Sequence, residues 1–85
     1  MQTTSVRCLC CGSRTLHTPG TFELCPVCWW QDDGQDETDA DVVRGGPNGL
    51  LSLTAARANF LALGACDPQF RTRVRAASAS ELATA

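Results

Sequence analysis

Two Cys-x2-Cys pairs are the residues of this sequence best suited to chemistry. Cys8 and Cys11 form the first pair, and Cys25 and Cys28 form the second, thirteen residues later. A Cys-x2-Cys turn places two sulfurs on the same side of a tight loop, and two such turns supply four thiolates at about 2.3 Å around a tetrahedral ion. We therefore expect one metal ion per chain, held by these four cysteines with no open coordination position.

The spacing alone leaves the metal undecided, because thiolates suit both zinc and iron. Zinc is the more frequent metal of structural four-cysteine sites, so we expect zinc, with a rubredoxin-like iron as the alternative. Disulfides are disfavoured by the adjacent Cys10 and Cys11 and by the lack of an apolar secretory segment near the first residues. A thioredoxin-type redox motif would leave one pair unexplained. We expect Cys10 and Cys66 to be spectators, Cys10 partly exposed and Cys66 buried.

The elements that bring the two pairs together are predicted from turn residues. Residues 14–16 and 21–24 favour strands, and Pro19-Gly20 between them favours a tight turn. This predicts a β-hairpin over residues 14–24, with Gly12 at positive φ in the first cysteine loop. Residues 29–51 are predicted to be an irregular loop, anchored by its tryptophans and by Val42-Val43, which is alternatively a third short strand.

Helix signals dominate the second half of the chain. Ser52 is a good N-cap and Gly64 a good residue to end a helix, and apolar residues recur at helical spacing between them, at Leu53, Ala56, Phe60 and Leu63. This predicts a helix over 53–63. Asp67-Pro68 predicts the start of a second helix, followed by a frayed tail from residue 78.

Length and charge restrict the class of protein. A chain of 85 residues forms one small domain. Its core alone gives marginal stability, so a domain of this size usually needs a metal, disulfides or a partner as well. No apolar run reaches the roughly 20 residues of a membrane span, and we expect a cytoplasmic protein. The net charge of −2 argues against general nucleic-acid binding. A closed site and a lone histidine, His17, expected in solvent, give no sign of an enzyme or a small-molecule substrate.

The residues after the second pair are candidates for binding a partner. Trp29 and Trp30 are adjacent, so in an extended chain they face opposite ways, one into the core and one toward solvent. Asp32 and Asp33 begin a run that holds six of the nine acidic residues. We expect the partner, another protein of basic character, to bind at Trp29, Trp30, Asp32 and Asp33. Arg57 is expected to pair with the acidic run.

Several motifs together resemble the bacterial cysteine-rich CPCC domain family. They are CLCCG at 8–12, PGTFELCPVCWWQDD at 19–33, GGPNG at 45–49 and SLTAARANF at 52–60. Leu9 stands where the family has proline, and Gln31 where it has glutamate. The resemblance covers residues 8–65 and implies a small zinc-ribbon-like protein with no established reaction.

The expected fold is a small metal-stabilised α+β domain. It has a zinc-ribbon or rubredoxin-like knuckle hairpin, a long loop and one or two C-terminal helices, divided into a flexible lead (1–7), the metal-binding domain (8–65) and a C-terminal helix with its tail (66–85). The expected function is that of a zinc-binding module for protein–protein interaction or regulation. The alternatives are a nucleic-acid-binding zinc ribbon and an iron electron carrier.

Overall fold

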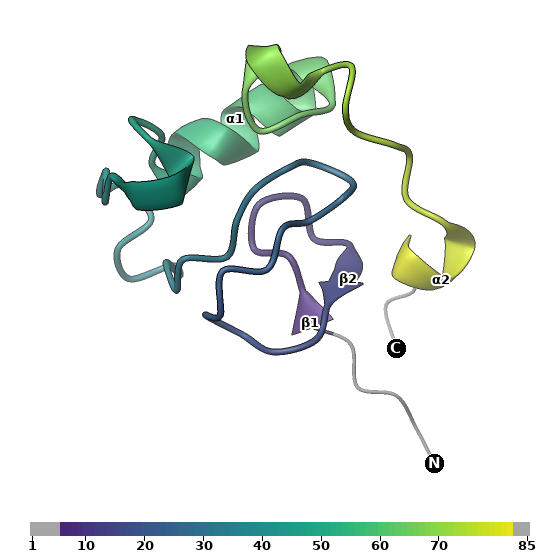
Figure 1. The fold of residues 1–85 in the computed structure, drawn as a ribbon, viewed down its shortest axis with the longest axis horizontal. Helices are drawn as coiled ribbons and strands as arrows, with labels where there is room; N and C mark the ends of the chain where they lie inside the picture. Colours follow the sequence, from purple (N-terminus) through teal and green to yellow (C-terminus); the bar gives the residue numbers. More distant parts are fainter. Residues whose placement is uncertain (1–5, 83–85) are drawn as a thin grey trace.

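Two short strands flank the first cysteine loop and form a two-stranded antiparallel sheet. The computed structural model describes residues 6–82. Strand β1 (Val6–Arg7) pairs with strand β2 (Arg14–Leu16), and Val6 lies opposite Leu16 (Figure 1). Residues 6–7, expected in the flexible lead, therefore belong to the sheet. The hairpin encloses the first Cys-x2-Cys loop, because that loop itself reverses the chain.

The predicted strand over 21–24 is wrong, although β2 matches the predicted strand over 14–16. The Glu23 carboxylate accepts hydrogen bonds from the backbone N–H groups of His17 (2.6 Å) and Thr18 (2.9 Å), so a side chain closes this turn. Residues 22–25 instead hydrogen-bond to residues 30–32, on the far side of the second cysteine loop. The His17 ring is in solvent, as predicted, with 76% of its side chain exposed.

The loop over 29–51 is irregular, as predicted, and Trp30 anchors it in the core, but Val42-Val43 does not. It contains one 3₁₀ turn, η1 (Gly46–Asn48). Val42 and Val43 are 50% and 51% exposed, and Val43 makes only a single bridge, to Ser52. Gln35 is fully buried instead, and its side-chain amide donates to the carbonyls of Asp39 (2.8 Å) and Val42 (2.5 Å). An amide can hold the loop by satisfying its carbonyls, which a valine cannot do.

Helix α1 (Leu53–Leu63) has the predicted bounds. The Ser52 hydroxyl accepts from the N–H of Ala55 at 3.0 Å, and Gly64 ends the helix at φ 80°. Leu53 and Ala56 are fully buried, whereas Leu63 is 38% exposed. The first half of the predicted apolar stripe therefore faces the core.

The predicted second helix is reduced to a single 3₁₀ turn, η2 (Pro68–Phe70), capped as expected by Asp67. The chain then runs without helix down the side of the molecule, and the N–H of Arg75 donates to the carbonyl of Pro26 (3.2 Å). A four-residue helix, α2 (Ala79–Leu82), lies beside β2 (Figure 1). A helix that continued from η2 would need the N–H of Arg75 for its own hydrogen bonds, but this N–H is bonded to Pro26 in the second cysteine loop. The rest of the expected lead and tail, 1–5 and 83–85, lies outside the described residues.

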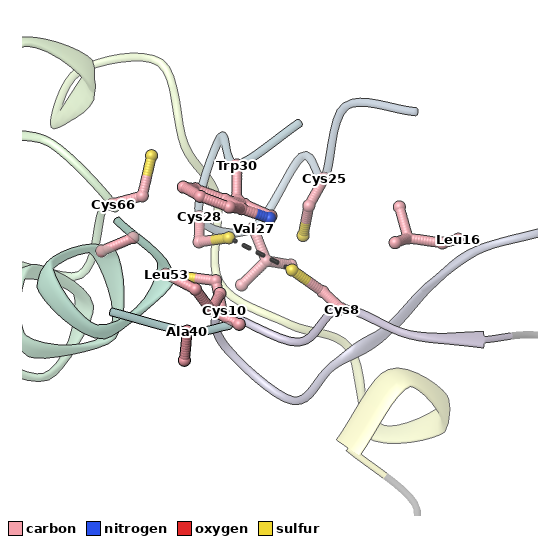
Figure 2. Close-up of a cluster of buried hydrophobic side chains, with 11 residues drawn as sticks. Cys8, Cys10, Leu16, Cys25, Val27, Cys28, Trp30, Ala40, Leu53 and Cys66 are labelled. Carbon is pink, nitrogen blue, oxygen red and sulfur yellow. Dashed lines mark hydrogen bonds between the residues drawn. The ribbon is translucent and has the colours of Figure 1, made fainter. Parts of the chain in front are cut away.

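The core is small and gathers around the cysteines (Figure 2). Its largest fully buried apolar side chains are Trp30, Leu16 and Leu53. Over the described part of the chain, no helix has the length and apolar character needed to cross a membrane.

Candidate metal centre

The sulfurs of the four predicted ligands lie together in the folded chain. All four are within 4.8 Å of one another. Cys8 and Cys28 are 3.5 Å apart and Cys11 and Cys25 are 3.7 Å apart, so the short contacts join one loop to the other. A tetrahedral ion with bonds of about 2.3 Å requires sulfurs roughly 3.8 Å apart. The cluster is therefore compatible with metal binding.

The two cysteine loops have the same backbone geometry. In each, the carbonyl of the first cysteine accepts from the N–H four residues later, Gly12 to Cys8 at 2.7 Å and Trp29 to Cys25 at 2.8 Å. The first cysteine's own N–H donates to the carbonyl five residues later, at 2.8 and 2.9 Å. Gly12 has the predicted positive φ, 81°, and Trp29 has φ 76°. A bulky residue is strained in this region, and no feature of the sequence indicated that Trp29 would adopt it.

Hydrogen bonds distinguish the four thiols electrostatically. The Thr15 hydroxyl, which sequence reasoning missed, donates to the Cys25 sulfur at 3.0 Å. The pKa of Cys25 is lowered, mainly by hydrogen bonding from Cys11 and to a smaller extent from Thr15, because donors stabilise a thiolate. The pKa of Cys28 is raised, first by contact with the Cys10 thiol. Within the cluster, Cys25 is therefore favoured as a thiolate.

The other two cysteines lie outside the four-sulfur cluster. Cys10 is only 8% exposed, so the prediction that it is partly exposed is wrong, since it packs in the core beside Cys28. Cys66 is buried, as predicted, and burial raises its pKa to about 12. A thiol with so high a pKa is a small core residue rather than a nucleophile. All six cysteines are free of disulfides.

Three of the four residues predicted to bind a partner are buried. Trp30 is 1% exposed, while Asp32 and Asp33 are 6% and 9% exposed. The two carboxylates accept backbone N–H groups, Asp32 from Gly20 in the preceding turn (2.8 Å) and Asp33 from Gln35 in its own loop (3.1 Å). Trp29 alone is half-buried, which confirms that one tryptophan lies in the core and the other is partly exposed.

Two arginines form ion pairs with carboxylates of the acidic run. The Arg57 guanidinium contacts both carboxylate oxygens of Glu37 (2.6 and 3.1 Å), as predicted, and also donates to the carbonyl of Leu9 (2.8 Å). Arg44 pairs with Asp39 at 2.6 Å. The pKa of Glu37 is lowered by its hydrogen bonds to Arg57. The acidic run therefore holds the long loop against the first cysteine loop and α1.

A groove lies beside the second cysteine loop. It has a volume of about 470 Å³, and its apolar wall comprises Leu24, Trp29, Leu51 and Phe70. The rings of Trp29 and Phe70 are 6.3 Å apart at 41°. Asn48 fixes the opposite wall, because its side chain both donates to the carbonyl of Gln31 (2.8 Å) and accepts from its N–H (3.1 Å).

Comparison with known proteins places the chain by its family. No curated protein and no solved structure matches it. A family model described as cysteine-rich CPCC matches residues 6–81, which include both cysteine loops, the long loop, α1 and the segment that returns to the second cysteine loop. The match extends beyond the 8–65 over which the motifs were recognised. The chain therefore belongs to the cysteine-rich CPCC family.

Proposed function

We propose that this protein is a small zinc-ribbon-like module in which one structural zinc ion holds the fold and the surface beside it binds another protein. The observation that carries the proposal is the cluster of four sulfurs within 4.8 Å. Four thiolates fill a tetrahedral ion, so the site has no position for a substrate or an activated water. We therefore propose a structural role for the ion and no catalytic one.

The first experiment measures the metal in the purified chain. Elemental analysis by mass spectrometry is expected to give one zinc per chain, in a colourless protein. Iron in the same cluster would give a red protein and would favour the alternative of an electron carrier, because four thiolates suit that metal equally. A purified, reduced chain that takes up neither metal on titration would refute the metal-centre proposal.

The groove beside Trp29 is the surface that best supports partner binding. Leu50 lies on its edge and is 90% exposed. Trp29 occupies the position in the second cysteine loop that Gly12 occupies in the first, and both have positive φ. This conformation strains a tryptophan but not a glycine, and such backbone strain is concentrated at functional positions. These features support binding of an apolar side chain between the rings and the edge of the groove.

The charged residues beside the groove indicate which charges the partner segment carries next to its apolar residue. Arg71 and Arg73 follow directly after Phe70 and are exposed, and neither makes an ion pair with any residue in 6–82. The six carboxylates of the acidic run all accept hydrogen bonds from within the chain. Two of them, Asp39 and Glu37, pair with Arg44 and Arg57, and the other four accept from backbone N–H groups or threonine hydroxyls. We therefore propose a partner protein that presents an apolar residue flanked by carboxylates, in place of the basic partner expected from the sequence.

Two exposed leucines provide a matched test of this surface. Leu50 is 90% exposed at the groove, and Leu61 is 87% exposed on α1 outside the residues that line it. A photo-crosslinking amino acid at position 50, in the cells that make the protein, is expected to capture a discrete partner through a peptide with carboxylates beside an apolar residue. Position 61 is expected not to capture it. Equal capture from both positions, or capture of nucleic acid, would refute the proposed interface.

A further inference from the structure

The indole N–H of Trp30 is a polar group buried in the core. Trp30 is 1% exposed, and its Nε1 has no hydrogen-bond partner among residues 6–82. A buried N–H without an acceptor is unfavourable, and in native proteins such groups are rare. Phenylalanine would fill a core position without this penalty, so the N–H requires an acceptor in the working state of the protein.

The sulfurs of the cysteine cluster are the acceptors that the indole faces. Figure 2 shows the Trp30 ring above the cluster, with its nitrogen edge turned toward the sulfurs of Cys25 and Cys8. The backbone fixes this placement, because the N–H of Cys25 donates to the carbonyl of Trp30 at 2.9 Å. A neutral thiol is a weak acceptor, whereas a thiolate is a strong one, because hydrogen bonds to ionised groups are shorter and stronger.

We propose that Trp30 donates its indole N–H to a thiolate of the metal centre and thereby sets the metal affinity of the site. This inference rests on the proposed metal-binding function. Four thiolates around a divalent cation carry a net charge of −2, which a core of this kind must neutralise. Thr15 already supplies one donor, to Cys25 at 3.0 Å, and the buried Trp30 would supply a second. Trp30 is thus a positioning residue that supports the ligands, as outer-shell donors do in other metal sites.

The test removes the N–H while keeping the shape of the ring. A chain of 85 residues is accessible to chemical synthesis, so Trp30 can be replaced by benzothienylalanine, in which sulfur takes the place of the indole N–H. The same replacement at Trp29 is the matched control. Zinc affinity, measured by competition with a chelator, is expected to fall about 10–100-fold at position 30. It is expected to be unchanged at position 29, whose ring faces the groove.

Two further readouts separate a supporting hydrogen bond from simple packing. With cobalt in the site, loss of the donor at position 30 is expected to move the thiolate-to-metal charge-transfer band to lower energy. In the unmodified chain, which has two tryptophans, the Trp30 indole proton is expected to shift downfield in the NMR spectrum on metal binding. Trp29→Phe assigns the signals.

Three outcomes would overturn the inference. The first is equal zinc affinity with and without the Trp30 N–H, and the second is a cobalt spectrum that the replacement leaves unchanged. The third is a chemical shift of the Trp30 indole proton that does not change on metal binding. These leave the metal centre itself intact. An unmodified chain that binds no metal would instead refute the proposed function, and this inference with it.

Discussion

Removal of the metal is expected to unfold the whole domain. Structural zinc contributes about 10–16 kcal/mol of apparent binding free energy in small zinc-finger peptides. The three largest fully buried apolar side chains, Trp30, Leu16 and Leu53, contribute roughly 5–9 kcal/mol together at about 1.5–3 kcal/mol each. The apolar core therefore cannot replace the ion.

The lengths of the elements support the same expectation. Helix α1 has 11 residues, below the roughly 12–15 residues that an isolated helix needs in water, and the strands have two and three residues. Neither element is expected to survive loss of the tertiary structure that the ion holds together.

Circular dichroism under reducing conditions tests this expectation. A chelator stronger than the site is expected to abolish both the helical signal of α1 and the cooperative thermal transition, and added zinc is expected to restore them. Chelator already saturated with zinc is the control. Persistence of both signals in a chain shown by elemental analysis to be metal-free would refute the reasoning.

The remaining predictions concern single residues and pH. Cys8→Ser is expected to lose the metal while Cys10→Ser retains one ion per chain, measured by elemental analysis; the reverse result would overturn the ligand assignment. Gly12→Ala is expected to destabilise the metal-loaded protein by about 1–2 kcal/mol in denaturant titration, through positive φ alone, because a Cβ there meets no atom within 4 Å; no loss would contradict this. Glu81→Gln removes the ion-pair partner of Arg75 (2.7 Å), which lines the same pocket as the half-buried Cys11, so faster zinc transfer to a chelator is expected; an unchanged rate would show that this ion pair does not restrict access to the site. Acidification is expected to release metal and unfold the protein together, because bound thiolates have depressed pKa values and their stabilisation is lost as pH falls; release without unfolding, seen by parallel metal and circular dichroism titrations, would separate the two.

The features that the sequence determined are those encoded by a few neighbouring residues. Ser52 and Gly64 set both ends of α1, because a cap and a left-handed residue act within one helical turn. Each Cys-x2-Cys loop directs two sulfurs to one side, so the cluster followed from spacing. The sequence also predicted one buried and one partly exposed tryptophan, although the left-handed backbone at Trp29 (φ 76°) is not the extended chain on which that prediction rested.

Tertiary structure decided the features whose partners are distant in sequence. Strand β2 pairs with β1 rather than with 21–24, because Glu23 takes up the backbone donors of the turn. The predicted second helix is shortened where Arg75 binds the carbonyl of Pro26, almost fifty residues earlier. Arg57 on α1 likewise finds its acceptor, Glu37, in the long loop twenty residues earlier. Propensity describes a residue and its near neighbours, whereas these contacts exist only after the cysteine loops have been brought together.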